Sequence, residues 1–240
     1  VILEGRWTRA LTAVDLVGAT ETLGKLEALY PDRQELVERR TGLTYLRALM
    51  DLPPGPRTER LAELVRGWPR ESALSGLHAN PNVTGRCLWT ALGAELAPGR
   101  TAPLANGLLP AEVAVRLEDW EAAAAGIAAS LRDLGEHAYL RQLQAWVLHK
   151  QGRHGSARDC LSLALFHDAA SCQVEFLPAD LAALYQKVRT TSTDSSVAWQ
   201  TLTFRAWQEG LLTILPTSTS YEKFLVGSLE TEPADPNDLG

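Results

Sequence analysis

The sequence has no run of about 20 apolar residues, so no segment of it is suited to cross a bilayer as a helix. It has no signal-peptide pattern at its start, and the net charge of −6 leaves no basic face for neutralising nucleic-acid phosphates. Runs of β-branched and aromatic residues are scarce before the C-terminal quarter, whereas Ala and Leu, both strong helix formers, dominate. We therefore expect a soluble, cytoplasmic, all-α protein with neither membrane insertion nor nucleic-acid binding.

Cysteine is also sparse, since the chain has only Cys87, Cys160 and Cys172 and no CxxC pair. We interpret them as reduced thiols packed in helices, with a disulfide between Cys160 and Cys172 as the alternative. The chain opens at Val1, inside what reads as a helical unit, and whether it is part of a longer chain or complex stays open.

A cluster of possible zinc ligands lies between positions 149 and 167 and consists of His149, His154, Cys160 and His167. Imidazole and thiolate do bind zinc, but no pair here has the CxxC or HxxxH spacing that makes such a signal specific. We therefore interpret these side chains as packing residues and predict no metal site.

Sequence motifs of catalysis are missing as well. The chain has no GxSxG for a nucleophilic serine, no GxxxxGK[ST] for phosphates and no GxGxxG for a dinucleotide. The acidic group Glu118, Asp119 and Glu121 falls at a helix junction, where carboxylates favour the helix N-terminus. We predict no catalytic residues and no cofactor.

Proline- and glycine-rich stretches divide the chain into helical segments. The expected organisation is helical pairs over 1–96, a connecting loop over 97–110, helical pairs over 111–189, a C-terminal segment over 190–230 and a disordered acidic tail over 231–240. The loop at 97–110 is the favoured boundary between two halves.

Residues 197–229 admit two interpretations. One helix face would contain Phe204, Trp207, Leu211 and Ile214. One strand face would contain Ala198, Gln200, Leu202 and Phe204, followed by a turn at 208–210 and a second strand at 211–215. The segment is therefore a helix or a β-hairpin.

Three segments share a pattern in which a turn is followed by a bulky ring, an Ala three residues later and an apolar residue four beyond. They are Gly5-Arg6-Trp7 with Ala10 and Val14, Glu118-Asp119-Trp120 with Ala123 and Ile127, and Gly152-Arg153-His154 with Ala157 and Leu161. The step from Trp120 in the second to His154 in the third equals the period of the tetratricopeptide repeat, about 34 residues.

On these residues, 111–169 resembles a pair of tetratricopeptide units and 1–17 resembles the second half of another. The resemblance implies a right-handed α-solenoid of antiparallel helix pairs. The pattern departs from the family where a large residue is expected early in the first helix, because Gly107 and Arg141 stand there. A generic helical hairpin is the alternative.

The resemblance also implies a concave groove lined by first helices. Trp146 lies in such a helix together with Arg141, Gln142 and Lys150, and we expect these four side chains to contact a partner. The expected function is a non-enzymatic scaffold or adaptor that binds a peptide or partner helix. The alternative is a helical sensor or regulatory module of a larger protein, binding a small ligand or a neighbouring domain. An enclosed pocket at the 97–110 loop would favour this alternative.

Overall fold

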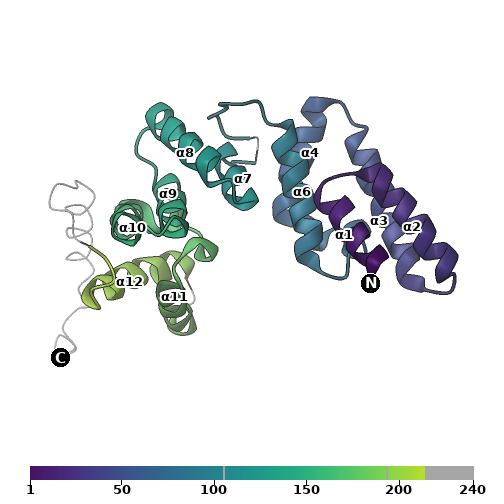
Figure 1. Cartoon of the computed structure of the whole chain (residues 1–240). Coiled ribbons are helices and arrows are strands. Elements are labelled where there is room, and N and C mark those ends of the chain that lie inside the picture. The colour runs from purple at the N-terminus through teal and green to yellow at the C-terminus, as the bar shows by residue number, and fades with distance from the viewer. Residues whose placement is uncertain (105, 193, 214–240) are drawn as a thin grey trace. The chain divides into compact units, whose positions relative to one another are not determined.

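A computed structural model describes residues 1–104, 106–192 and 194–213, and all regular structure in these ranges is helical (Figure 1). The α-helices are α1 (Ile2–Thr12), α2 (Leu16–Leu29), α3 (Gln34–Met50), α4 (Pro54–Gly67), α5 (Ser72–Ser75), α6 (Pro81–Glu95), α7 (Pro110–Leu117), α8 (Trp120–Leu134), α9 (Ala138–Lys150), α10 (His154–Asp168), α11 (Ala179–Thr191) and α12 (Ser195–Gln208). Three 3-10 turns are η1 (Trp68–Arg70), η2 (Ala169–Ser171) and η3 (Val174–Phe176). The prediction of an all-α fold is confirmed.

The chain forms two compact units, Val1–Gly126 and Ile127–Gly240, which divide inside α8. The sequence favoured a division at 97–110, but this loop packs onto the first unit. Leu104 and Leu108 are buried in its core, and the Asn106 side-chain amide donates to the Ala62 carbonyl over 2.6 Å. The loop therefore contributes to the core of the first unit and is more than a linker.

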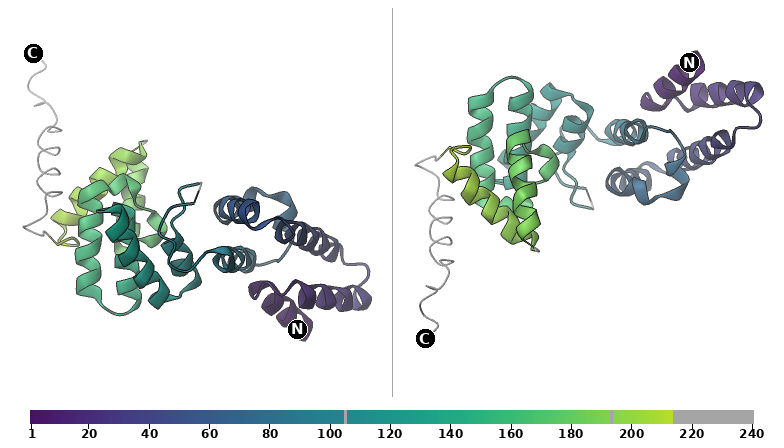
Figure 2. Two further views of the ribbon diagram at one scale, coloured as in Figure 1. Left: turned by 90° about the horizontal axis from the view of Figure 1, so that it is seen from above. Right: turned by 90° about the horizontal axis from the view of Figure 1, so that it is seen from below.

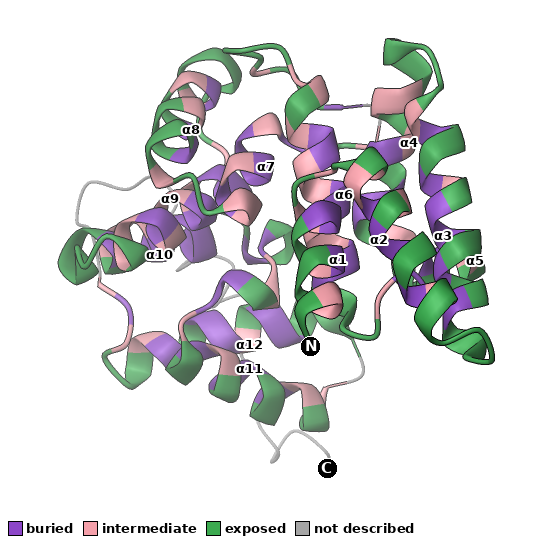
Figure 3. Cartoon of the chain, turned by 45° about the vertical axis from the view of Figure 1, so that its right-hand side comes forward, coloured by how far each residue is buried: buried purple, intermediate pink, exposed green. Residues whose placement is uncertain are grey.

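Helices distant in the sequence pack together in the first unit. Helix α1 contacts both α2 and α6, α4 contacts α6, and α3 contacts α2 and α5. Buried residues face one continuous core, while the outer faces of α2 and α3 are exposed (Figure 3). In an open solenoid each helix pair contacts only its neighbours, so the packing of α1 on α6 makes this unit a closed helical bundle.

Two helical hairpins dominate the second unit. Helices α9 and α10 pack side by side (Figure 2), as do α11 and α12, and α12 also rests on η2. The second hairpin is joined by Tyr185 and Trp199, whose ring centroids lie 4.6 Å apart. A separate core of buried apolar residues runs from Ala145 to Leu212.

The hairpin interpretation of the C-terminal segment is wrong for residues 197–208, which belong to α12. Asp194 caps this helix, because its carboxylate accepts hydrogen bonds from the amides of Ser196 and Val197 at 2.7 and 3.3 Å. Residues at helical spacing fill the core, which the strand pattern could not do: Ala198, Trp199, Leu202 and Ala206. The predicted tail at 231–240 lies outside the described residues.

Three turns between consecutive helices have the same conformation. Val14, Glu118 and Gly152 each adopt a left-handed conformation, with φ of 56°, 62° and 77°, two residues before the next helix begins. The following amide donates to a carbonyl five residues earlier, in the pairs Asp15–Ala10 (2.8 Å), Asp119–Ala114 (3.0 Å) and Arg153–Leu148 (2.9 Å). This hydrogen-bond pattern is the Schellman motif.

The residues after each turn also correspond. The fifth residue beyond the left-handed position is a buried alanine and the ninth is a buried aliphatic residue: Ala19 and Leu23, Ala123 and Ile127, Ala157 and Leu161. The turns at Glu118 and Gly152, which belong to the two segments predicted to be one repeat period apart, therefore match each other. The first segment needs a correction of register, because Gly5-Arg6-Trp7 lies inside α1 and the turn comes later, at Val14. Residues 2–29 thus make a complete hairpin.

Substitutions at two of these left-handed turn positions should change the free energy of unfolding in opposite directions. A side chain in the left-handed region costs about 1–2 kcal/mol, so Glu118→Gly should raise the free energy of unfolding by about 1 kcal/mol and Gly152→Ala should lower it by a similar amount. A Cβ added at Gly152 meets nothing within 4 Å, so its backbone angle is the cause. Gly155→Ala, in a helix and equally uncrowded, is the control and should not destabilise. Urea denaturation measures the free energy of unfolding of all three variants. Equal effects of Gly152→Ala and Gly155→Ala would show that the left-handed backbone at Gly152 is not the cause.

His78 connects the loop before α6 to α1. Its Nδ1 accepts from the Asn80 amide (2.9 Å), so in the neutral ring the proton is on Nε2, which donates to the Thr8 hydroxyl over 2.9 Å. Burial, and secondly the charge of Arg39, lower the pKa of His78 below its ordinary value. The unfolded chain therefore binds a proton more readily than the folded chain does.

Acidification should consequently destabilise the first unit. The free energy of unfolding should fall as the pH drops through about 6.5, the ordinary histidine pKa, because protonation then favours the unfolded state. His78→Gln should flatten this part of the pH dependence. Denaturation midpoints between pH 8 and pH 5 test the difference, and parallel curves for the two proteins would refute it.

Candidate interaction site

The first predicted contact residue, Arg141, is engaged within its own helix region. Its Nε and Nη2 donate to the two carboxylate oxygens of Glu136 at 2.7 and 2.8 Å, and its Nη1 donates to Gln144 at 3.0 Å. The hydrogen bonds from Arg141 lower the pKa of Glu136. Arg141 therefore neutralises a carboxylate beside the start of α9 and would reach a partner only by breaking this pair.

Gln142 does not lie on the surface, because its side chain is 0 % exposed. Its amide donates to the Gln173 carbonyl over 2.7 Å, and its carbonyl oxygen accepts from the Gln173 amide over 2.8 Å. Gln142 thus ties α9 to the chain before η3. The expectation that it contacts a partner is corrected, since α9 turns this position inward.

Gln142→Leu should lower the free energy of unfolding by about 1–3 kcal/mol, because the amide and carbonyl of Gln173 would lose their partners. Gln151→Leu, at an exposed position after α9, is the matched control and should stay within about 0.5 kcal/mol of the parent. Thermal unfolding of the two variants compares them directly. Equal midpoints would mean that the paired hydrogen bonds do not stabilise α9.

The other two predicted residues do share a surface. Trp146 is half-buried, with its ring edge-on to Phe176 at 5.8 Å between centroids, and the Lys150 ammonium lies 4.6 Å from the centre of the indole. His149 stacks beside Trp146 and contacts His154 across the turn. We call these four residues, Trp146, His149, Lys150 and His154, the α9 surface.

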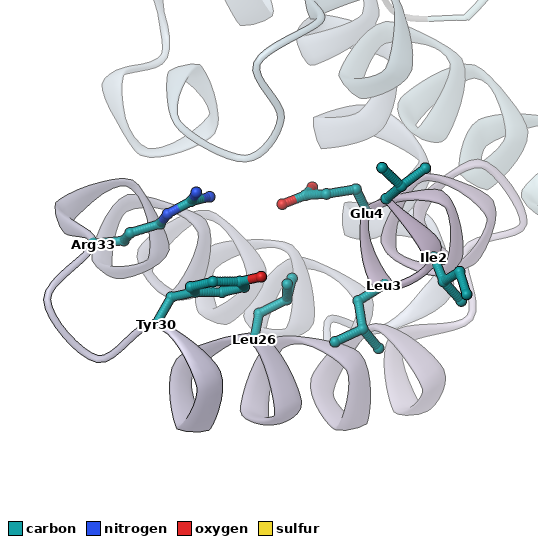
Figure 4. A pocket seen from close by; sticks show the side chains of 7 residues that line it. Ile2, Leu3, Glu4, Leu26, Tyr30 and Arg33 are labelled. Atoms are coloured by element: carbon teal, nitrogen blue, oxygen red, sulfur yellow. The ribbon is translucent and has the colours of Figure 1, made fainter.

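A pocket of about 530 Å³ opens in the first unit (Figure 4). The start of α1 and the end of α2 form its walls, and Arg33, just before α3, completes it. Its lining is mainly apolar, with one acid and one base: Val1, Ile2, Leu3, Glu4, Leu26, Tyr30 and Arg33. The volume lies within the range of about 300–1,000 Å³ that is typical of ligand clefts.

Both charged groups of the pocket are held by neighbours. The Glu4 carboxylate accepts from buried Arg39 at 2.8 Å, while the Arg33 guanidinium lies 4.6 Å from the centre of the Tyr30 ring and pairs with Glu35 at 3.1 Å. In Figure 4 the Glu4 and Arg33 side chains extend toward each other above Leu26 and Tyr30. The apolar floor thus has an acidic group on one side and a basic group on the other.

Large apolar side chains around this pocket are open to solvent. Ile2 is 74 % exposed, Leu29 62 % and Tyr30 45 %. Leu23, Leu26 and Leu29 follow helical spacing along α2, but only the first two are buried. Helix α2 ends at Leu29 with Tyr30 as its C-cap, and Pro31 directly after the cap is the sequence signal for this helix end.

Burial affects the thiols in the described part of the chain, and it raises the pKa of all three. Burial raises the pKa of the Cys87 and Cys172 thiols to about 12, so neither supplies a reactive thiolate at neutral pH. All three cysteines are free thiols. Among the described residues, no three His, Cys, Asp or Glu side chains are grouped so that they could hold a metal ion.

Comparison with protein-family models, curated protein sequences and solved structures gives no match for this chain. None of the helices in the described ranges combines the length and the apolar character needed to cross a membrane. The pocket of the first unit and the α9 surface of the second are the two candidate interaction sites.

Proposed function

We propose that this chain is a non-enzymatic interaction scaffold of the tetratricopeptide-like kind, which binds a peptide or partner helix. The three matching hairpin turns, two of them one repeat period apart, support the family resemblance. The closed packing of α1 on α6 differs from an open solenoid, so the proposed likeness is one of hairpin units. The three free thiols support a reducing location such as the cytoplasm.

The pocket at α1 and α2 is the observation that carries this proposal. Amphipathic partner helices bind by inserting apolar side chains into apolar grooves, and Leu3, Leu26 and Tyr30 supply such a floor. Glu4 and Arg33 lie on its two sides and pair with Arg39 and Glu35, so a partner with a basic and an acidic residue flanking the apolar anchor would join these existing pairs. The proposed occupant is therefore an amphipathic helix of another protein.

The α9 surface is a second proposed contact. Trp146 and Lys150 remain the residues that we expect to meet a partner there, because a partly exposed tryptophan is a frequent interface anchor. Arg141 is proposed only as a support for the start of α9, through its pair with Glu136.

Affinity capture with the full chain as bait tests the proposal. Ile2→Asp combined with Tyr30→Ala alters exposed positions and should leave the fold intact, yet it should reduce capture of the partner about tenfold or more. Val17→Asp, which changes another exposed apolar residue of α2, is the matched control and should capture normally. Cross-linking followed by mass spectrometry should map the partner segment to an amphipathic helix. Equal capture by the parent and the double variant would disprove binding at this pocket.

The alternative function is a sensor or regulatory module that binds a small ligand or a neighbouring domain. The size of the pocket is the observation that favours it, although the pocket lies at α1 and α2 and not at the 97–110 loop. A small-molecule screen by thermal shift discriminates between the two functions. A compound that stabilises the parent and the Val17→Asp control, but not the Tyr30→Ala variant, would favour the sensor.

A further inference from the structure

Two histidines that are separate in the sequence meet across the turn between α9 and α10. His149 lies in the last turn of α9, and His154 is the first residue of α10. The left-handed Gly152 reverses the chain between them, so that their Nδ1 atoms lie 3.2 Å apart and their ring centroids 4.9 Å apart. Their spacing along the chain matches no zinc motif, which is why the sequence predicted only packing.

The contact requires a free lone pair. A hydrogen bond between two Nδ1 atoms needs one donor and one acceptor. One of these atoms therefore has a proton, and the other has a free lone pair. The neutral imidazole lone pair is also the group that binds Zn²⁺, Cu²⁺ and Ni²⁺. The pair therefore already presents one nitrogen in the form that a metal ion needs.

The distance fits two ligands of one ion. With metal–nitrogen bonds of about 2.0–2.1 Å and tetrahedral angles, two ligand nitrogens stand roughly 3.3–3.4 Å apart. The observed separation of 3.2 Å is within about 0.2 Å of this value. His149 is partly exposed and His154 is exposed, so an ion from solvent can reach the two nitrogens.

We propose that His149 and His154 form a binding site for a divalent transition-metal ion of the zinc, copper or nickel class, coordinated by both Nδ1 atoms. The proton of the donor ring moves from Nδ1 to Nε2 when the ion binds, so a neutral pair releases no net proton. Since no third His, Cys or carboxylate is grouped with the pair in the described ranges, water completes the coordination. The ion links the end of α9 to the start of α10, beside Trp146.

Titration calorimetry of the untagged, chelator-treated chain with zinc chloride tests the site. We expect one equivalent to bind, and His149→Gln or His154→Gln to weaken binding on the order of tenfold or more, since even residues behind a ligand cost that much. His167→Gln, which removes another exposed histidine of α10, is the control and should leave the affinity unchanged. Circular dichroism checks that each variant is folded.

Electron paramagnetic resonance with Cu²⁺ gives an independent readout. The parent chain should show hyperfine coupling to two imidazole nitrogens, and each single variant should show coupling to one. Binding that is non-stoichiometric, or that falls equally in the His167→Gln control, would identify an adventitious ion only and overturn the proposal. The capture experiment at the α1–α2 pocket is separate, so failure of one proposal leaves the other standing.

Discussion

Trp7→Ala should lower the free energy of unfolding of the first unit by about 3–5 kcal/mol, the usual cost of truncating a buried aromatic residue. Trp7 is 0 % exposed and belongs to the core that joins α1 to α2 and α6. The guanidinium of Arg39, itself buried, lies 5.8 Å from the centre of its ring. Loss of the indole would therefore leave a large cavity and remove the aromatic face beside a buried cation.

Trp7→Phe is the matched comparison. The indole Nε1 has no hydrogen-bond partner among the described residues. Replacing the indole with an apolar ring should therefore cost about 1–2 kcal/mol, for lost volume. Because the chain has two compact units, unfolding need not be a single two-state transition. Hydrogen exchange of amides in α1 and α6 isolates the first unit. Similar protection in both variants would show that the size of the side chain at position 7 does not control its stability.

Removing both arginines around Glu112 should destabilise the first unit by about 3–5 kcal/mol. The Glu112 side chain is 1 % exposed, and its two carboxylate oxygens bind Arg66 (3.1 Å) and Arg116 (3.4 Å). The double substitution Arg66→Met with Arg116→Met would leave a buried carboxylate without these partners, which is the costly way to break such a pair. Glu112→Gln should cost less, because the arginines are more exposed and can turn to solvent.

The triple variant that adds Glu112→Leu to the two methionines should recover most of the lost stability. Buried ion triads often gain no net stability over well-packed apolar residues, because removing the charges from water offsets their attraction. Chemical denaturation of the parent, double and triple variants gives the three free energies of unfolding that this comparison needs. A triple variant as unstable as the double would show that the arginines make contacts that methionine does not replace, including that of the Arg116 guanidinium over the Trp89 ring.

Much of the helical organisation follows from local sequence, because caps and breaks act within a few residues. Pro31, the prolines after Met50 and the Asn80-Pro81 step each separate two helices, as expected. The sequence placed the first turn at Gly5-Arg6-Trp7, whereas the structure has it at Val14. The left-handed conformation of Val14 is one that favours glycine, so a valine gives no sign of a turn there. The spacing of one repeat period was visible because Trp120 and His154 both begin helices.

The sequence by itself determined the helical class and several of the breaks between helices, since these depend on neighbouring residues. Only the tertiary structure decided which helix faces are covered. Gln142 is buried because the segment at η3 packs against its side of α9, and Leu29 is exposed because no described segment covers the end of α2. His149 and His154 meet because a left-handed glycine reverses the chain between them. Such contacts depend on how segments pack in space, which periodicity along one helix does not encode.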